Sequence, residues 1–282
     1  MNIPLHYEQL QFVLDVASYR NNFLDPIFRF LNYADSFYFN FLLTSFVWVG
    51  FSYRWGLRLF YLLVINFILN ASFKTWIGWP RPCMDFPDVG MFCPSDFGFP
   101  SGGAQTCMLL GGLLIYYWKT RAAWIIGVSY ILLISFSRIY LGVHYPLDIL
   151  GGWAIGLSLL LLYVQLIDPI ETFLKSQSLP FCFFLSEALP LLLIIAATAS
   201  YCQPYDAMAV GLGAFLSLKY RLYLSGPKTI IKGLLRGAIA AGMLFLIFAL
   251  LPSNLSISLS LGIVSLWISL GASPVCKHVL RI

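Results

Sequence analysis

Residues 137–148 read Ser-Arg-Ile-Tyr-Leu-Gly-Val-His-Tyr-Pro-Leu-Asp, and they place an arginine, a histidine and an aspartate between two long apolar segments. Ionisable groups at membrane depth are costly and usually functional. If a helix begins near Pro146, the Asp148 carboxylate can reach back to the His144 imidazole. A carboxylate on one ring nitrogen sets the tautomer and leaves the other nitrogen free to attack or to transfer a proton. Arg138 adds a planar set of donors suited to phosphate.

The composition is that of an integral membrane protein. Of 282 residues, 60% are hydrophobic and 10% are charged, whereas a soluble domain carries about 25% charged residues. The formal charge of +5 comes without a basic run, so we expect no nucleic-acid partner. The first 35 residues lack a basic start followed by an apolar core. We therefore expect the first spanning helix, and not a cleaved signal peptide, to direct insertion.

We expect an all-α, polytopic helix bundle in three parts. Residues 1–35 mix apolar and charged positions, which predicts amphipathic helices in the membrane interface. Residues 36–168 hold about five apolar stretches near the ~20 residues of one crossing, together with the polar motifs. Residues 169–282 hold about four more and no motif that assigns them a role. The predicted spans are 36–53, 57–75, 103–118, 122–141, 147–167, 181–200, 206–223, 233–251 and 256–275.

The distribution of Lys and Arg predicts the orientation of the chain. With nine spans, one side receives twelve of the 17 basic residues, and an excess of basic residues marks the cytoplasmic side. The other side receives Arg20, Arg29, Lys74, Arg81 and Arg138. The sequence therefore predicts that the polar motifs share one outer face. We expect a bacterial inner membrane, with this face periplasmic and the C-terminus cytoplasmic.

Two segments are predicted not to be helical: residues 77–100, rich in Pro, Gly and Asp, and the short link around 142–146. Cys83 and Cys93 lie in the first of these. In an oxidising compartment they could form a disulfide. Two free thiols fit the sequence equally well, because the distance between them is not given by spacing alone.

Three pieces of sequence together describe a phosphate site. They are Lys74-Thr-Trp-Ile-Gly-Trp-Pro-Arg81-Pro82, Pro100-Ser101-Gly102-Gly103 and the stretch 137–148. A serine hydroxyl and free backbone N–H groups at a helix start form an anion cradle. Arginines and a lysine can neutralise the oxygens of a transferring phosphoryl group, which is most of what such a reaction requires. We therefore expect no metal and no other cofactor.

The three pieces resemble the signature of the type 2 phosphatidic acid phosphatase (PAP2) superfamily of membrane lipid phosphatases, over roughly residues 5–168. The family's first motif, Lys, six residues, Arg-Pro, matches 74–82, and its third, Ser-Arg, five residues, His, three residues, Asp, matches 137–148. The resemblance implies that His144 forms a phosphohistidine and that Asp148 orients it. It implies the following phosphate ligands: Lys74, Arg81, Ser101, Gly102 and Arg138.

The second motif departs from the family pattern. The family has Pro-Ser-Gly-His, and Gly103 stands here in place of the histidine, which the family uses to protonate the leaving oxygen. General acid catalysis is worth ~10²–10⁴ in rate. The substrate could have a good leaving group, such as the phosphate of a lipid diphosphate, or another residue could supply the proton. Gln105 can donate a hydrogen bond but not a proton, and Asp96, Tyr140 and Tyr145 are further candidates. Alternatively, the enzyme is slow or only binds its ligand.

We therefore predict a metal-independent membrane lipid phosphatase that acts on a lipid phosphate or lipid diphosphate through a phosphohistidine. The alternatives are a lipid phosphotransferase and a catalytically impaired protein that binds or transports lipid phosphates. Glu187, an acid within the predicted span 181–200, would be required in the transport case. The expected partners are this substrate and the bilayer, and the sequence does not indicate the lipid tail or the oligomeric state.

Overall fold

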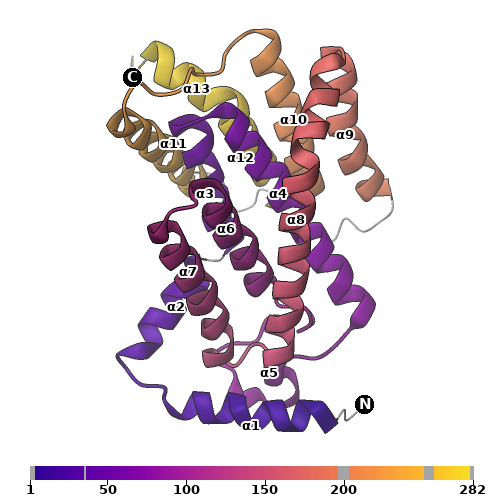
Figure 1. Cartoon of the computed structure of the whole chain (residues 1–282), viewed down its shortest axis with the longest axis vertical. Helices are drawn as coiled ribbons and strands as arrows, with labels where there is room; N and C mark the ends of the chain where they lie inside the picture. Colours follow the sequence, from indigo (N-terminus) through magenta and orange to yellow (C-terminus); the bar gives the residue numbers. More distant parts are fainter. Residues whose placement is uncertain (1–3, 35, 196–202, 251–256, 280–282) are drawn as a thin grey trace. The chain divides into compact units, whose positions relative to one another are not determined.

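The computed structural model describes residues 4–34, 36–195, 203–250 and 257–279 (Figure 1). These residues contain helices and no strand, which confirms the all-α prediction. The helices are α1 Pro4–Ser18, α2 Leu24–Ala34, α3 Phe37–Gly50, α4 Tyr53–Ile77, α5 Pro82–Asp85, α6 Gly102–Trp118, α7 Arg121–Tyr140, α8 Pro146–Ser176, α9 Leu179–Ile195, α10 Gln203–Lys219, α11 Ile230–Leu250, α12 Ile257–Leu266 and α13 Ala272–Pro274. A 3₁₀ turn covers Pro87–Val89, and π-helical turns cover Trp267–Gly271 and Val275–Val279.

Among the described residues, four helical stretches are long and apolar enough to cross a bilayer. They are Tyr53–Asp85, Arg121–Tyr140, Pro146–Ser176 and Ile230–Ile247. Helices also lie in the described parts of the other predicted spans, but they are shorter; α6, for example, has 17 residues. The nine-span count is therefore supported for four crossings and stays a prediction for the rest. The longest of these helices, α8, has 31 residues and extends past the predicted end at 167, with Pro169 inside it.

The chain divides into two compact units. The first comprises Met1–Phe39 and Ile65–Ile167, and the second comprises Asn40–Val64 and Asp168–Ile282. The helices α4 and α8 each contribute to both units. All the polar motifs singled out in the sequence belong to the first unit. The three-part division by sequence, with an interfacial N-terminus and a C-terminal extension, stays a prediction.

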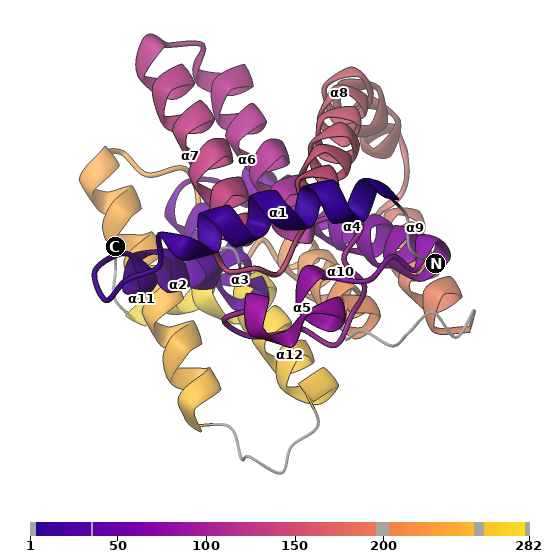
Figure 2. The same cartoon turned by 90° about the horizontal axis from the view of Figure 1, so that it is seen from below.

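In the first unit, α6 packs along α7, and α1 runs across the ends of α7 and α8 (Figures 1 and 2). The amphipathic α1 and α2 bury one apolar face against the end of α7 and the link that follows it. Gln9 in α1 accepts a hydrogen bond from the backbone N–H of Leu147 at 2.8 Å. The opposite faces leave large apolar side chains exposed, among them Phe12 and Phe30. The N-terminal helices therefore support the link that carries His144.

The turn after α7 depends on Gly142. Its φ is +71°, a backbone conformation that residues with a Cβ rarely adopt. A Cβ here would lie 2.1 Å from the carbonyl oxygen of Val89. The Arg20 guanidinium, in the link between α1 and α2, donates to the carbonyls of Val89 and Tyr140 at 2.7 Å each. These contacts bring the loop after α5 against the turn that precedes His144.

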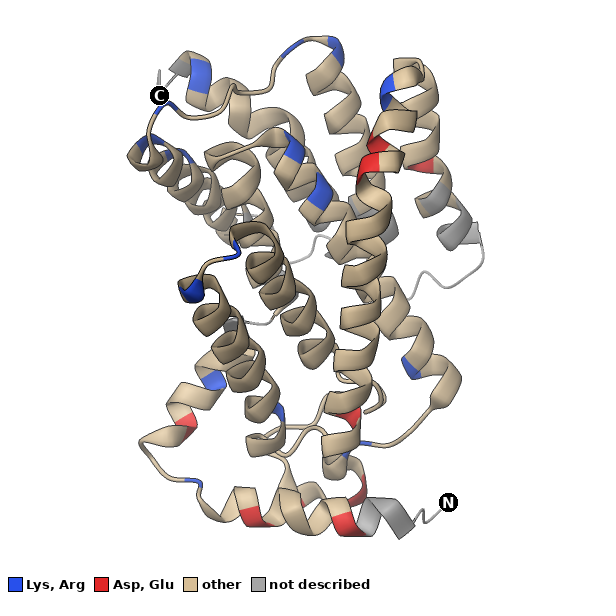
Figure 3. Cartoon of the chain, in the orientation of Figure 1, with Lys and Arg blue, Asp and Glu red and all other residues tan. Residues whose placement is uncertain are grey.

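In the second unit, α10 packs against α9 and α12. Gly50 at the end of α3 lies against Gly233 and Gly237 of α11, which allows the two backbones to approach closely. Arg54 and Arg58 form ion pairs with Glu171. Charged positions are sparse along the middle of the helices (Figure 3), and α8 has none between Asp148 and Asp168.

Candidate active site

The first and third motifs meet at Arg81 and His144. Arg81 is the residue before α5, and its extended backbone (φ −88°, ψ 158°) turns the buried guanidinium toward the link between α7 and α8. Its Nη1 lies 2.9 Å from His144 Nε2 and donates to the carbonyl of Val143 at 3.0 Å. Arg81 and His144 are therefore in hydrogen-bond contact although they lie 63 positions apart in the sequence.

Asp148 holds the other side of the His144 ring. Because α8 begins at Pro146, Asp148 lies in its first turn, and its Oδ2 is 3.2 Å from His144 Nδ1. The same oxygen accepts the backbone N–H of Tyr145 at 2.9 Å. A carboxylate accepts and a guanidinium donates, so this pattern assigns the proton to Nδ1 and the lone pair to Nε2. Nε2 is therefore the ring nitrogen whose lone pair can attack an electrophile.

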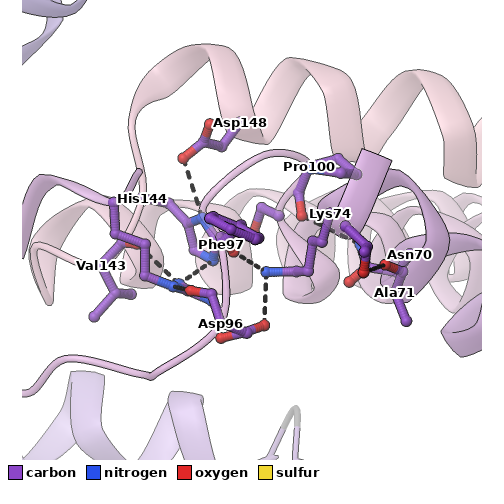
Figure 4. Close-up of polar contacts among 12 residues, drawn as sticks. Asn70, Ala71, Lys74, Asp96, Phe97, Pro100, Val143, His144 and Asp148 are labelled. Carbon is purple, nitrogen blue, oxygen red and sulfur yellow. Dashed lines mark hydrogen bonds and ion pairs between the residues drawn. The ribbon is translucent and has the colours of Figure 1, made fainter. Parts of the chain in front are cut away.

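Asp96 lies between the two cations of the first motif (Figure 4). Its Oδ1 accepts from Arg81 Nη2 at 2.6 Å, and its Oδ2 is 2.9 Å from Lys74 Nζ. Arg81 Nε also donates to the Asp96 backbone carbonyl, and Lys74 donates to that of Phe97. Burial by itself would raise the pKa of the Asp96 carboxyl, but Arg81 and Lys74 outweigh burial and lower the pKa below its usual value. A carboxylate thus occupies donors that suit a phosphate.

The second motif forms the start of α6. Ser101 is the N-cap, and its Oγ accepts the backbone N–H of Ala104 at 3.4 Å. Its own backbone N–H donates to the carbonyl of Asp148 at 2.9 Å, which ties this helix start to the start of α8. A Cβ on Gly102 would lie 3.1 Å from Asn70 Oδ1. The first turn of α6 therefore presents backbone N–H groups, which favour an anion.

A buried amide network supports that helix start. Asn70 Nδ2 donates to the carbonyl of Pro100 at 3.2 Å and to Gln105 Oε1 at 2.9 Å. Gln105 Nε2 donates to Asn66 Oδ1 at 3.0 Å, and Asn66 Nδ2 donates to Thr106 Oγ1 at 2.9 Å. Asn66 and Asn70 of α4 thus form hydrogen bonds to α6. Gln105 is fully buried, and its bonds join this network.

Arg138 and the other cations set the charge around the imidazole. Arg138 lies in the last turn of α7, is buried, and donates to Asn32 Oδ1. Burial lowers the pKa of His144 well below its ordinary value, and the charges of Arg81, Lys74 and Arg138 lower it further. The imidazole is therefore neutral at neutral pH, which is the protonation state in which Nε2 can attack.

A disulfide joins Cys83 and Cys93, ten positions apart. The loop it closes is held to the turn after α7 by the backbone N–H of Met91, which donates to the carbonyl of Leu141 at 2.9 Å. Asp96 follows this loop by three residues. The disulfide thus restrains the segment that carries the carboxylate.

The three residues that the sequence suggested as proton donors have different hydrogen-bond partners in the structure. The Tyr140 hydroxyl donates to Asp25 at 2.7 Å, and the Tyr145 hydroxyl faces Asp85 at 3.5 Å. Only Asp96 is bonded to the guanidinium that contacts His144. Sequence reasoning missed the pairing of Asp96 with Lys74 and Arg81; its place between two motifs rich in cations was the available signal. It also missed Asn32 as the partner of Arg138.

Residues 55–170 match the model of the PAP2 superfamily. An undecaprenyl-diphosphatase of Sulfolobus acidocaldarius is 36% identical over 88 residues, which span 29% of this chain and 42% of that protein. Phosphatidylglycerophosphatase B of Bacillus subtilis is 32% identical over 149 residues, which span 48% of this chain and 71% of that protein. The crystal structure of a transmembrane PAP2-type phosphatidylglycerolphosphate phosphatase from Bacillus subtilis superposes with a TM-score of 0.52 at 25% identity, covering 60% of this chain and 89% of that one.

Proposed function

The chain belongs to the PAP2 superfamily of membrane lipid phosphatases, and we propose that it hydrolyses a lipid phosphate or lipid diphosphate through a phosphohistidine on His144. The observation that carries this proposal is the single guanidinium of Arg81, which contacts His144 Nε2 through one nitrogen and the Asp96 carboxylate through the other. An anion held at the second position lies beside the nucleophilic lone pair.

Substrate binding begins with an exchange of anions. The phosphate of the substrate displaces the Asp96 carboxylate from Lys74 and Arg81, because those donors are engaged by Asp96 when no phosphate is bound. The Asp96 side chain is 40% exposed, so it has room to leave. Arg138, the Ser101 hydroxyl and the Gly102 N–H complete the set of phosphate ligands that we propose, in line with the three motifs.

The chemical step follows from the tautomer. The lone pair of His144 Nε2 forms a bond to phosphorus while the bond to the leaving oxygen breaks in line, and the leaving oxygen takes the electron pair. Asp148, bonded to Nδ1–H, stabilises the phosphorylated imidazolium. Water then attacks phosphorus, returns the electron pair to Nε2 and releases inorganic phosphate.

We further propose that lipid diphosphates are the better substrates. Gly103 stands where the family motif has the histidine that protonates the leaving oxygen, and Gln105, two positions on, is engaged by Asn66 and Asn70. A phosphate monoester is a far better leaving group than an alkoxide and needs little proton assistance. The low-identity likeness to an undecaprenyl-diphosphatase agrees with this preference.

The site is proposed to open on the outer face of a bacterial inner membrane, where a lipid headgroup enters while its tail stays in the bilayer. This follows from the distribution of Lys and Arg between the two sides of the predicted spans. The residues from 169 onward are proposed to form an additional membrane segment of about four helices. Metal independence is part of the same proposal, and full activity in excess EDTA is the result it predicts.

The test is phosphate release from matched lipid monophosphates and diphosphates by the purified full chain in detergent. The wild type should cleave diphosphates faster, His144→Ala should lose at least 10³-fold in rate, roughly the share of a positioned nucleophile, and His6→Ala should match the wild type. Gly103→His should raise monophosphate cleavage by about 10²-fold. Acid-labile ³²P on the wild type but not on His144→Ala would identify the intermediate.

Four results would contradict the proposal. Equal turnover of both substrate classes would show that another group supplies the proton. Transfer of ³²P to an added alcohol in preference to water would indicate a phosphotransferase. Full activity of His144→Ala would remove His144 from the reaction, and binding without turnover by the wild type would indicate a protein that only binds lipid phosphates.

A further inference from the structure

The second unit contains a cavity of about 540 Å³ whose charged lining is entirely basic. Among the residues that the structure describes, its cations are Arg221, Lys228, Lys232, Arg236 and Lys277, and none of those lining it is Asp or Glu. They come from the link between α10 and α11, the first turns of α11 and the π-helical turn Val275–Val279. Basic positions gather along this link and the start of α11 in Figure 3. Cavities that bind small molecules usually measure about 300–1,000 Å³.

Arg236 shows that the cavity is more than an exposed basic surface. Its side chain lies on the second turn of α11 and the residue is 8% exposed. One nitrogen, Nη1, donates to the carbonyl of Ser225 at 2.9 Å. Its buried Nε has no hydrogen-bond partner among the residues that the structure describes. Arg236 also lines the cavity. A buried charged group with an unpaired donor costs free energy, and an anion bound to this guanidinium would offset part of that cost.

The helix geometry adds to the positive potential. Thr229 precedes α11, and its Oγ1 accepts the backbone N–H of Lys232 at 3.3 Å. The N-terminal end of a helix carries a partial positive charge, and here Lys232 and Arg236 lie in its first two turns. Five cations around one cavity repel one another unless an anion lies among them.

An alternative is that these basic residues only set the orientation of the chain in the membrane, which would explain exposed lysines at helix ends. They would not explain an arginine that is largely buried in a cavity with an unpaired nitrogen. The stretch Ile230–Ile247 is long and apolar enough to cross a bilayer, so its first turns lie at headgroup depth if it does. Basic pockets at that depth bind the phosphates of anionic lipids.

We propose that this cavity binds a phosphate-bearing group with at least one full negative charge, held by Arg236, Lys228 and Lys232. The group is either the headgroup of an anionic phospholipid or a free diphosphate. This site is separate from the proposed phosphatase site, because every lining residue belongs to the second unit and Lys74, Arg81 and His144 belong to the first. The proposal does not depend on catalysis.

The experiment uses the purified full chain and two ligands. In one arm the protein is placed in nanodiscs of equal parts phosphatidylglycerol and phosphatidylcholine, and the lipids retained after mild detergent extraction are counted by native mass spectrometry. In the other arm, inorganic pyrophosphate is titrated into the protein in neutral detergent. The variants are Arg236→Gln and the double substitution Lys228→Gln with Lys232→Gln, which changes exposed side chains and so tests the site if Arg236→Gln does not fold.

The wild type should show saturable binding in at least one arm, and both variants should weaken it by tenfold or more. Lys175→Gln, with a side chain 71% exposed, is the control for loss of one charge and should bind as the wild type does. Because pyrophosphate can also bind the proposed phosphatase site, the pyrophosphate arm is repeated in an Arg81→Gln background, where the binding that depends on Arg236, Lys228 and Lys232 should persist. Retention of phosphatidylglycerol identifies a lipid site, and binding of pyrophosphate alone identifies a site for free phosphates. No saturable binding in either arm, or equal binding by the variants, would overturn the proposal.

Discussion

The substitution Asp96→Asn tests whether the Asp96 carboxylate competes with phosphate for Lys74 and Arg81. In the wild type, Arg81 and Lys74 each contact one oxygen of Asp96, at 2.6 and 2.9 Å. Asparagine has nearly the same size and keeps one acceptor oxygen, but it lacks the negative charge. Any phosphate that binds Arg81 and Lys74 must first displace this side chain, so loss of its charge should make phosphate bind more tightly.

The size of the effect follows from the two contacts. Hydrogen bonds to charged groups contribute about 1.5–3 kcal/mol each when buried. Because the Asp96 side chain is 40% exposed, solvent screening reduces this to about 0.5–1 kcal/mol per contact. The two contacts together therefore weaken phosphate binding by about 1–2 kcal/mol, which corresponds to roughly a 5- to 30-fold lower affinity for phosphate.

The assay is inhibition by inorganic phosphate, which is the product and should compete with the lipid substrate. The inhibition constant of Asp96→Asn should be roughly 5- to 30-fold lower than that of the wild type. Asp96→Glu keeps the charge and should stay near the wild type. Asp88→Asn, an exposed carboxylate of the neighbouring loop, is the matched control for charge and should have no effect.

An unchanged inhibition constant in Asp96→Asn would refute the displacement step, because it would mean that phosphate binds without contacting the donors that Asp96 uses. A higher inhibition constant would also refute it, since it would mean that Asp96 helps to hold the anion. A large loss of kcat with a lower inhibition constant would show, in addition, that the displaced carboxyl protonates the leaving oxygen.

Three further predictions concern stability in detergent. The pKa of His144 is below its usual value in the folded protein, so at this group the unfolded state binds more protons below about pH 6.5; the Tm of the wild type should therefore fall relative to that of His144→Gln between pH 6.5 and 5. Gly142→Ala should lower the unfolding free energy by about 2–4 kcal/mol or prevent folding, because its Cβ would meet Val89 at a positive φ, whereas Gly242→Ala, inside α11 with nothing near its Cβ, should leave Tm unchanged or raise it slightly. Reducing the Cys83–Cys93 disulfide should cost about 2–3 kcal/mol through the loop it closes, and a Tm unaffected by dithiothreitol would show that the loop is held by its other contacts.

Much of the site was accessible from spacing, because the relevant geometry is local. His144 and Asp148 are four residues apart across a helix start at Pro146, and helix geometry alone brings such a carboxylate back to the ring. Ser101 before a glycine-led helix likewise predicts an N-cap. The positions of the helices follow from apolar runs, which is why the all-α fold was correctly predicted.

The extent of the helices was less accessible. Apolar length indicates that a segment is long enough to cross, but Pro169 did not end α8, and α6 is shorter than a typical span. A helix end depends on which backbone groups find partners, and those partners come from other parts of the chain. The count of nine crossings therefore rests on four helices of sufficient length and on shorter ones that the sequence alone assigns.

From the sequence by itself came the membrane class, the helices and the three polar motifs, because composition and short-range periodicity determine them. The tertiary structure alone decided which groups meet. Asp96, in the irregular segment 90–101, lies between Lys74 and Arg81, and Gln105 of α6 belongs to a network with Asn66 and Asn70 of α4. Segments without regular hydrogen bonding have no period from which to infer direction. Their side chains are positioned by contacts with residues distant in sequence, and such contacts exist only once the chain has folded.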